Sequence, residues 1–406
     1  MKAELESVLR HMNVDRLDAL LMDAVRRYSP SLAEEPATEV FEAALDGAGV
    51  PSWRQPVESE ETTEDDRASV SVVAKVADQP RGGRAGGKAA RRANLIVQLG
   101  PEPAALMWVG HVDTIALKHD EDHKVRKDGD LVYGLGAADM KGGCAAMVEA
   151  VIAVSEAKIP LKRGVKVAFV VGEEEIGDGS EAVVEVLDSP LTVVGEPTGL
   201  IPCIDHYGYL EYRLTSLGRR AHAALPEIGD NAIHLMLSWI TDILRQATRL
   251  PAGDQMAVSL REIRGGTGVF VTADQCEALL DVHLPPGLDG GVIAGMIEEA
   301  KEALPRGGRA DLSFEELFWA PGYATHPGDP RLAPLGSAFQ AEGLTWEPGT
   351  FRSHSDAPTL YTAGTLPVIC GPGRLEVAHT RFEHVSLDEV HRAARLYAAM
   401  ICASCV

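Results

Sequence analysis

Three apolar runs in this chain each end directly in a polar motif. The runs span Ala104 to Val109, Gly164 to Val171, and Leu191 to Val194. A short, continuous apolar run is typical of a strand that is buried on both faces, as in a parallel sheet. Ligands of such α/β proteins bind where the strands end and the loops begin. The sequence therefore predicts an α/β domain, with helices on both faces of a mostly parallel sheet and a polar site at its carboxyl edge.

Other segments supply the rest of this domain. Amphipathic patterns predict helices at Leu5–Arg27 and Ala37–Ala48, whereas Ser69–Val76 and Asn94–Leu99 resemble strands. Gly142–Ala157 has few helix breakers and has apolar residues at helical spacing. We expect it to be the helix that crosses back over the sheet.

The residues after Glu196 show a different pattern. Strand-like and helical segments follow in the order strand, helix, strand, strand, helix, strand, namely Tyr209–Leu217, Asn231–Thr248, Met256–Ile263, Val269–His283, Gly291–Ala303 and Leu312–Leu317. This order predicts an α+β domain with a four-stranded antiparallel sheet and two helices. We expect it to occupy residues 206–319, inserted into a larger domain formed by residues 1–205 and 320–406.

The charge balance restricts the partners of this chain. Its 406 residues carry a formal net charge of −22, which disfavours binding to nucleic acid or to anionic membranes. No apolar run in the sequence approaches the ~20 residues of a membrane helix. The N-terminus is charged and six cysteines are scattered along the chain, so we expect reduced thiols in a cytoplasmic protein.

Two motifs suggest metal-binding chemistry. His111 and Asp113 lie two residues apart after the first apolar run, so both side chains project from one face of a strand. Asp113 can therefore orient the imidazole of His111. Asp139 lies between glycine-rich flanks, and its two carboxylate oxygens can bridge two cations. A capped strand end and a helix N-cap are the structural alternatives for these two motifs.

Further carboxylates follow the other two runs. Glu173, Glu174 and Glu175 come after the second run, and adjacent carboxylates repel one another unless cations neutralise them. Glu196 follows the third run. A solvated acidic run and a turn ending at proline are the structural alternatives. Together with two imidazoles and Asp139, these carboxylates would supply the ligands of two Zn²⁺ ions. Two such ions can activate a water molecule for hydrolysis.

Five short motifs follow one another along the chain, and their order carries a family resemblance. They are His111-Val112-Asp113-Thr114, Gly136-Ala137-Ala138-Asp139-Met140-Lys141-Gly142-Gly143, Gly172-Glu173-Glu174-Glu175, Gly195-Glu196-Pro197-Thr198 and Ala378-His379-Thr380. Their order and spacing resemble the M20 family of metallopeptidases and deacylases. The resemblance runs from about Val109 to Val390.

This resemblance implies a site for two Zn²⁺ ions, with Co²⁺ or Mn²⁺ as possible substitutes. It assigns one ion to His111, Asp139 and Glu196, and the other to Asp139, Glu175 and His379. His384 is the alternative to His379, but the family pattern places a Glu four residues after the ligand, as Glu383 stands to His379. Asp139 would bridge the two ions. The peptide bond after Asp139 is expected to be cis.

Three further residues have roles implied by the resemblance. Glu174 would be the general base that takes a proton from water and passes it to the leaving amine. Asp113 would support His111. His222 would reach across a homodimer interface to stabilise the oxyanion, so that the inserted domain serves as a lid and dimerisation domain. A purely structural histidine is the alternative for His222.

Two positions depart from the family pattern. Family members that bind a substrate carboxylate often carry an Asn and an Arg where this chain has Phe270 and His283. The metal-binding residues are thus intact, whereas the carboxylate clamp is altered. Four arginines could replace the clamp, and each is also a possible surface ion-pair partner: Arg261, Arg264, Arg352 and Arg374.

We therefore expect a zinc-dependent amidohydrolase, similar to a deacetylase or desuccinylase, that cleaves an N-acyl or peptide bond of a small amino-acid derivative. A dipeptidase or carboxypeptidase of the same fold would share every metal-binding residue. A non-catalytic metal-binding scaffold should lack Glu174 or a ligand, and none is missing. A third alternative is a deacylase whose amino-acid substrate is attached to a small acidic carrier protein. The basic segment Arg81–Arg92 would bind that carrier, unless the segment is a solvated linker.

Overall fold

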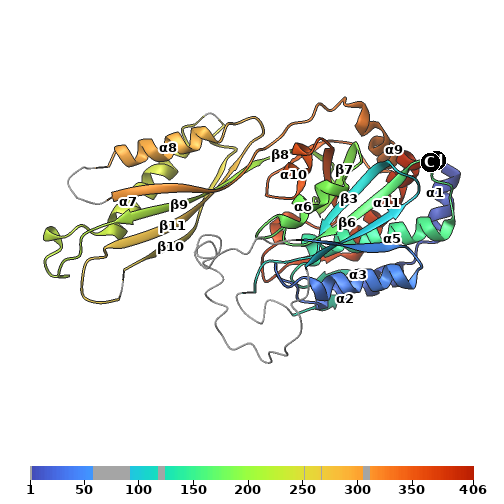
Figure 1. Cartoon of the computed structure of the whole chain (residues 1–406), viewed down its shortest axis with the longest axis horizontal. Coiled ribbons are helices and arrows are strands. Elements are labelled where there is room, and N and C mark those ends of the chain that lie inside the picture. The colour runs from blue at the N-terminus through green and yellow to red at the C-terminus, as the bar shows by residue number, and fades with distance from the viewer. Residues whose placement is uncertain (1, 58–91, 118–123, 251, 267, 305–310) are drawn as a thin grey trace. The chain divides into compact units, whose positions relative to one another are not determined.

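The computed structural model describes residues 2–57, 92–117, 124–250, 252–266, 268–304 and 311–406 (Figure 1). They form two compact units. The first comprises Met1–Ile204, Thr325–Phe351 and Ser355–Val406, and the second comprises Asp205–Ala324 and Arg352–His354. We expected the inserted domain at residues 206–319, without the tripeptide 352–354. The predicted strand at 69–76 lies outside the described residues.

An eight-stranded sheet forms the centre of the first unit. From edge to edge, its order is β1 (Ser52–Pro56), β2 (Ala93–Leu99), β6 (Gly164–Val170), β3 (Ala104–His111), β7 (Leu191–Pro197), β14 (Leu366–Gly371), β8 (Cys203–His206) and β13 (Gly349–Phe351). β3 pairs in parallel with β6 and β7, and β14 pairs in parallel with β7. β2 pairs antiparallel with β1 and β6, and β8 pairs antiparallel with β14. The four central strands therefore form the predicted parallel sheet, with antiparallel strands at its margins.

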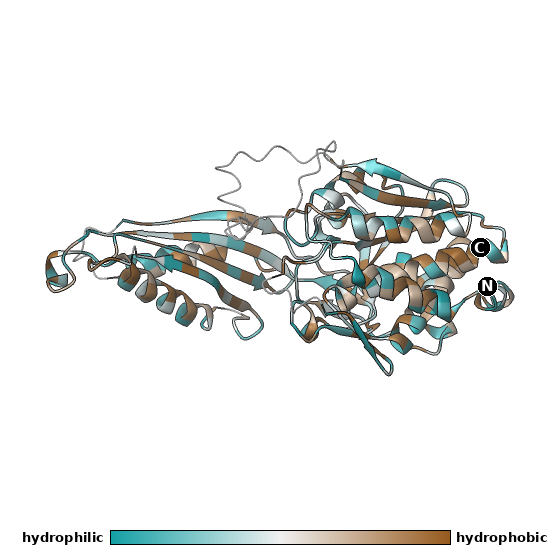
Figure 2. Ribbon diagram, turned by 90° about the horizontal axis from the view of Figure 1, so that it is seen from below, coloured by the Kyte–Doolittle hydropathy of each residue, from teal (hydrophilic) through white to brown (hydrophobic). Residues whose placement is uncertain are grey.

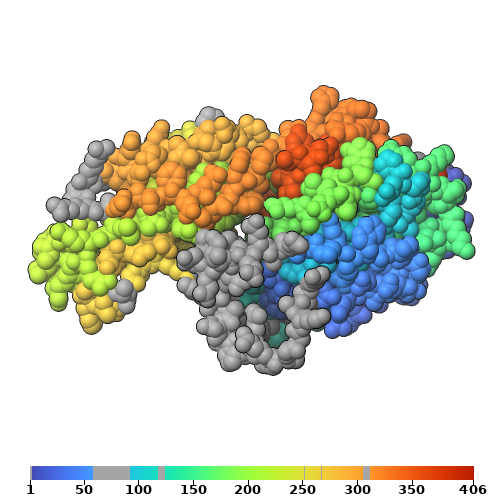
Figure 3. All heavy atoms as spheres, in the orientation of Figure 1, coloured from blue at the N-terminus to red at the C-terminus, as the bar shows by residue number. Residues whose placement is uncertain are grey.

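The first unit contains helices in the three predicted regions and others that were not predicted. Those described are α1 (Lys2–Leu9), α2 (Val14–Arg26), α3 (Glu35–Gly47), α5 (Gly142–Ala157), α6 (Asp178–Val183), α9 (Ala333–Ala341), α10 (Ala357–Thr362) and α11 (Leu387–Cys405). The single helix predicted at 5–27 is instead two, because Asn13 caps α2 by accepting a hydrogen bond from the backbone N–H of Arg16 at 3.0 Å. Residues of α1 to α3, blue in Figure 3, form part of the outer surface of this unit.

Helices cover both faces of the sheet, as predicted. Phe169 of β6 stacks on Phe41 of α3, with ring centroids 5.3 Å apart. Lys166 lies on the other face of β6, because successive side chains of a strand alternate. Its ammonium group donates to the carbonyl of Val186, just after α6, at 3.1 Å. The central strands are thus enclosed on both sides, which explains why their sequences are continuously apolar.

Smaller elements complete the first unit near its polar edge. A three-stranded sheet has the order β15 (His384–Ser386), β5 (Leu131–Tyr133), β4 (Arg126–Asp128). Two short helical segments, η3 (Ala137–Lys141) and η7 (Leu375–Val377), precede α5 and β15 respectively. Within the described ranges, no helix has both the length and the apolar character needed to cross a membrane.

The second unit is an α+β structure of the predicted kind. Its antiparallel sheet has the order β10 (Ala257–Gly265), β11 (Gln275–Leu284), β9 (Gly208–Leu217), β12 (Asp311–Ala320), and its longer helices are α7 (Ala232–Ala247) and α8 (Gly291–Glu302). β11 begins at Gln275 and not at Val269 as predicted. The segment before it turns aside, and Val271 forms an isolated bridge with His222.

The core of the second unit lies between its sheet and its two longer helices. Leu210, Tyr212 and Leu214 of β9 are buried, whereas the residues between them are partly exposed. Strands of this sheet accordingly show alternating hydrophilic and hydrophobic bands in Figure 2. The indole N–H of Trp239 in α7 donates to the carbonyl of Ile297 in α8 at 3.0 Å, which ties the two helices together.

Candidate metal centre

Three neighbouring strands bring polar side chains to one edge of the parallel sheet. His111 is the last residue of β3, Glu196 lies near the end of β7, and Glu173 and Glu174 follow β6. β6, β3 and β7 are adjacent and parallel. Their carboxyl ends therefore meet, and the polar motifs after the three apolar runs are brought together.

Asp139 reaches this edge from η3, just before α5. Its peptide bond to Met140 is cis, as expected. The turn depends on its glycines, because Gly136 has a φ of +79° and a Cβ at Gly143 would lie 2.4 Å from the carbonyl oxygen of Gly195. The glycine-rich motif thus lets the Asp139 turn approach β7 closely.

The first group of possible ligands consists of His111, Asp139 and Glu196, all of them buried. His111 Nε2 lies 3.1 Å from Asp139 Oδ1 and 3.8 Å from Glu196 Oε1. One ligand atom from each residue lies within 4.8 Å of the others. The structure therefore brings together the three residues that the family resemblance assigns to one ion.

The second group consists of Asp139, Glu174 and His379, with the same 4.8 Å limit between ligand atoms. His379 Nε2 lies 2.9 Å from Glu174 Oε2 and 3.3 Å from Asp139 Oδ2. Asp139 thus presents Oδ1 to the first group and Oδ2 to the second, as a bridging carboxylate does. The side chain of His379 is 45% exposed, so the second group opens to solvent whereas the first is enclosed.

Glu175 does not join either group. We expected Glu175 as a ligand and Glu174 as the base, but Glu175 is exposed and Glu174 lies within the second group. The tight turn after β6 is the reason. The backbone N–H groups of Ile176 and Gly177 both donate to the carbonyl of Gly172, at 2.9 and 2.7 Å. This turn brings Glu174 to the site and leaves Glu175 at the surface.

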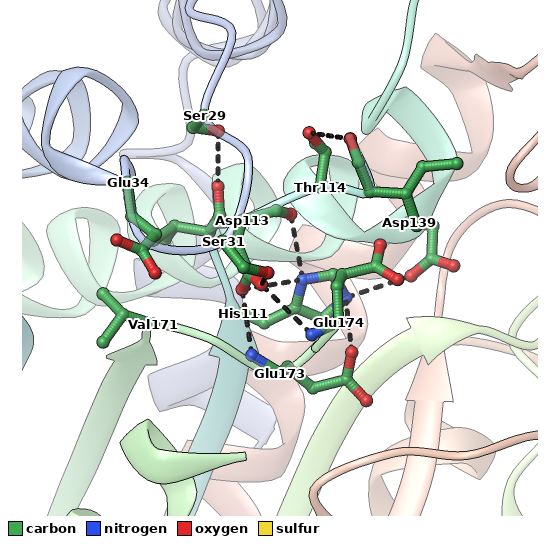
Figure 4. Close-up of polar contacts among 12 residues, drawn as sticks. Ser29, Ser31, Glu34, His111, Asp113, Thr114, Asp139, Val171, Glu173 and Glu174 are labelled. Carbon is green, nitrogen blue, oxygen red and sulfur yellow. Dashed lines mark hydrogen bonds and ion pairs between the residues drawn. The ribbon is translucent and has the colours of Figure 1, made fainter. Parts of the chain in front are cut away.

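Asp113 connects the loops that carry these ligands (Figure 4). Its carboxylate accepts hydrogen bonds from the backbone N–H groups of Glu173 and Glu174 at 3.2 and 3.1 Å, and from the Ser31 hydroxyl at 2.6 Å. His111 Nδ1 lies 3.1 Å from the Asp113 carbonyl oxygen. Burial raises the pKa of Asp113, but hydrogen bonds from His111, Ser31 and the backbone outweigh it and hold the pKa below its usual value. Asp113 therefore stays ionised behind His111.

The carboxylates of the site are crowded. Burial, followed by the charge of Asp139, raises the pKa of Glu196 well above its usual value. Glu196 Oε1 is buried and has no hydrogen-bond partner among the described residues. Burial also raises the pKa of Glu174 to about 8. Burial lowers the pKa of His379, but Asp139 and Glu174 outweigh it and raise the value to about 11. Cations would relieve this crowding, and a carboxylate and imidazole donor set fits Zn²⁺.

Two buried residues next to the site had no predicted role. Glu173 is 7% exposed, and its Oε2 lies 3.9 Å from His111 Nε2. Glu383 is 2% exposed and contacts the backbone of the Asp139 turn; burial raises its pKa to about 7. Only their positions, one residue before Glu174 and four after His379, could have marked them in the sequence.

A cluster of ion pairs supports the turn that carries Glu174. Arg92 Nη2 donates to Glu34 Oε1 at 2.7 Å and to Asp178 Oδ1 at 3.0 Å. The exposed fractions of the three side chains are only 12%, 2% and 12%. Arg92 ends the basic segment considered above as a docking site, of which residues 81–91 lie outside the described residues. Arg92 itself joins the start of α3 to the start of α6.

Two arginines proposed for substrate binding already have acidic partners within the second unit. Arg261 pairs with Glu211 and lies 3.7 Å from Asp281. Arg264 pairs with Glu262. Both arginines are thus already engaged in partly exposed ion pairs of this unit.

The other two candidates of the second unit, His283 and Arg352, contact aromatic rings. The ring of His283 lies 5.0 Å from that of Tyr209, and burial lowers its pKa to about 4. Arg352 lies over the ring of Tyr207, with its guanidinium carbon 5.3 Å from the ring centroid. His283 is therefore neutral near pH 7 and cannot supply the charge of the family's arginine.

His222 and Phe270 lie on adjoining loops at the surface of the second unit. His222 is exposed, and its Nδ1 accepts a hydrogen bond from the backbone N–H of Ala224 at 3.1 Å. The backbone N–H of Ala223 donates to the carbonyl of Phe270, whose side chain is 88% exposed. An imidazole in this position is accessible to a ligand or to another subunit.

Two groups of possible ligands share Asp139 at the carboxyl edge of the parallel sheet, which is an arrangement suited to a pair of metal ions. The family described as Peptidase family M20/M25/M40 matches residues 107–403, and the chain belongs to this family of metal-dependent hydrolases of amide bonds. An acetylornithine deacetylase of Photorhabdus laumondii is 27% identical over 323 residues, which cover 76% of this chain and 82% of that protein.

Solved structures share the whole fold. Human carnosine dipeptidase 1 is 13% identical, with a TM-score of 0.73 over 98% of this chain and 99% of that one. A dinuclear metal-binding peptidase of the M20 family from Bacillus subtilis is 14% identical, with a TM-score of 0.63 over 95% of this chain and 97% of that one. The likeness therefore extends across both units.

Proposed function

We propose that this protein is a zinc-dependent amidohydrolase that cleaves an N-acyl or peptide bond of a small amino-acid derivative. The observation that carries the proposal is the position of Asp139, whose two carboxylate oxygens face two separate groups of ligand atoms. The similarity to an acetylornithine deacetylase supports an N-acyl amino acid as the substrate.

In this proposal, both ions are held by residues of the first unit. One ion is assigned to His111, Asp139 and Glu196, and the other to Asp139, Glu174 and His379. Glu174 replaces Glu175 in the ligand set predicted from the sequence, because Glu174 lies beside Asp139 and His379. When bound, two such ions polarise the scissile carbonyl and promote ionisation of water near neutral pH.

The assignment of the general base also moves by one residue, from Glu174 to Glu173. The Glu173 carboxylate lies beside the first group, and its backbone N–H is held by Asp113. Glu173 would accept a proton from the attacking water and return it to the leaving amine. One carboxylate can serve both steps because the proton that it accepts in the first step is released in the second.

The second unit completes the proposed enzyme. We assign oxyanion stabilisation to His222, reaching the site of the other subunit in a homodimer. Support comes from the segment Gly229-Asp230-Asn231-Ala232-Ile233 after His222, which also fits the family pattern, and from the exposure of His222. The six cysteines, all buried and none in a disulfide, suit the reducing cytoplasm in which we place the reaction.

Activity on a substrate panel tests the proposal. The panel comprises N-acetyl amino acids, N-succinyl amino acids and dipeptides, assayed with the native protein, after chelation, and after Zn²⁺ is restored. We expect hydrolysis of at least one amide class, loss of activity on chelation and recovery with Zn²⁺. Preference for dipeptides would identify a peptidase that uses the same residues. Full activity after complete metal removal would contradict the proposal, as would inactivity on every amide with two ions bound.

A further inference from the structure

Glu383 connects two of the three loops that carry the ligands of the second group, namely those of Asp139 and His379. Its Oε1 accepts hydrogen bonds from the backbone N–H groups of Ala138 and Asp139, at 3.0 and 3.2 Å. Its own backbone N–H donates to the carbonyl of Thr380 at 3.0 Å, next to His379. Glu383 thus contacts the Asp139 turn with its side chain and the His379 loop with its main chain.

The position of Glu383 is fixed by further main-chain contacts. Its carbonyl accepts a hydrogen bond from the backbone N–H of Gly134 at 3.1 Å. The next residue, His384, begins β15, which pairs with β5 just before the Asp139 turn. Because the side chain is 2% exposed, it cannot swing into solvent without moving these contacts. The geometry is that of a rigid support and not of a mobile surface group.

The buried carboxylate has a free-energy cost that its hydrogen bonds must offset. Two backbone N–H donors converge on one oxygen, which is a strong arrangement for a negatively charged acceptor. The other oxygen, Oε2, has no hydrogen-bond partner among the described residues. Loss of the Glu383 carboxylate would leave the buried backbone N–H groups of Ala138 and Asp139 without this acceptor, which would destabilise the Asp139 turn.

We propose that Glu383 is a positioning residue that holds the Asp139 turn and the His379 loop in the relative placement needed for the second metal ion. This inference rests on the proposed function, since it assumes that Asp139, Glu174 and His379 hold an ion. Glu383 belongs to neither group of possible ligands. Its effect is exerted through the backbone of Asp139, the residue shared by both ligand groups.

Metal affinity of Glu383 variants tests this role. E383A removes the acceptor, E383D withdraws it by one methylene, and E383Q keeps an acceptor oxygen but loses the charge. We expect the more weakly held of the two Zn²⁺ ions to bind ~10–100-fold more weakly in E383A and E383D, as is usual when a residue supporting a ligand is lost. E383Q should fall between these variants and the wild type. Chelator competition and elemental analysis give the affinities, without reference to turnover.

A matched control separates positioning from general stability. Glu149 of α5 is equally buried, accepts a hydrogen bond from the backbone N–H of Asn13 and pairs with Arg16. E149Q should lower the melting temperature and leave both metal affinities as in the wild type. If E383A does not fold, E383D and E383Q give the answer.

The outcomes distinguish this inference from the proposed function. Binding of two ions by the wild-type protein would support the proposed metal site, whatever the role of Glu383. If it does so while E383A, E383D and E383Q bind both ions as tightly as E149Q does, the role of Glu383 is overturned and the metal site stands. A wild-type protein that binds no ion overturns both.

Discussion

Glu174 Oε2 lies 2.9 Å from His379 Nε2, whereas the preceding residue, Glu173, has its carboxylate 3.9 Å from His111 on the other side of the site. Two consecutive glutamates therefore face different ligand groups. Because they differ in position but not in chemistry, single substitutions of each can separate metal binding from proton transfer.

We predict that Glu173→Gln keeps both metal ions and loses most of its turnover, while Glu174→Gln loses one ion. Removal of a general base commonly lowers kcat ~10²–10⁴-fold. Glu175→Gln is the control, since Glu175 is exposed and lies in neither group. Metal content by elemental analysis and kcat on the best substrate of the panel are measured for all three. If Glu175→Gln loses a metal ion while Glu174→Gln keeps both ions and loses turnover, the assignment made from the sequence is correct and the present one is wrong.

A second prediction concerns the ion-pair cluster behind the Glu174 turn. Arg92→Met leaves the buried carboxylates of Glu34 and Asp178 without their cation, and should lower the free energy of unfolding by ~3–5 kcal/mol. Arg54→Met is the matched control, because Arg54 pairs with the more exposed Glu42 and should cost about 1 kcal/mol or less. Denaturant unfolding gives both values. Equal losses would mean that the burial of the Arg92 cluster has no special effect.

A third prediction is acid sensitivity of the second unit. Burial lowers the pKa of His206 from 6.5 to about 3, so between these values the folded protein binds fewer protons than the unfolded chain. The resulting stability is complete above pH 6.5 and is lost as the pH falls toward 3, by up to about 1.4 kcal/mol for each pH unit.

The denaturation midpoint should therefore fall between pH 6.5 and pH 4 more steeply in the wild type than in His206→Asn, which cannot be protonated in this range. His234→Asn is the control in the same unit, because the exposed imidazole of His234 is solvated whether the chain is folded or not. Parallel pH profiles for the wild type and His206→Asn would show that His206 is not the sensitive group.

The fourth prediction concerns substrate choice. His283 is neutral near pH 7 and offers at most one hydrogen bond to a carboxylate, whereas an arginine offers two parallel charged bonds. His283→Arg combined with Phe270→Asn should therefore raise kcat/KM for N-acetylornithine, by an amount equivalent to about 1.5–3 kcal/mol. Each single variant serves as a control for the pair. No gain in the double variant, with good activity in the wild type, would show that another residue binds the carboxylate.

Much of the fold could be predicted because a strand that is buried on both faces of a sheet has a continuously apolar sequence. The continuous apolar runs identified β3, β6 and β7, and alternation identified β9. The break at Asn13 was missed because amphipathic spacing continues across it, and only the capping hydrogen bond reveals two helices.

The motifs that form the site could be predicted, but the role of each glutamate after β6 could not. Three consecutive glutamates differ only in where the turn at Gly172 directs them, and that turn depends on backbone hydrogen bonds. Glu383 was noticed only as a companion of His379, because nothing in a sequence shows that a carboxylate will accept two N–H bonds from a turn 244 residues away.

The tripeptide Arg352–His354 belongs to the second unit although the chain has already left that unit at Ala324. The ring of His354 lies 5.5 Å from that of Tyr209 and 5.4 Å from that of Phe318. A recombination event that exchanged only residues 205–324 between two relatives would place one parent's Tyr209 and Phe318 against the other parent's tripeptide. The second unit is therefore encoded by two separate segments of the gene. Chimaeras that transfer both segments together should retain this contact, whereas those that exchange only residues 205–324 should disturb it.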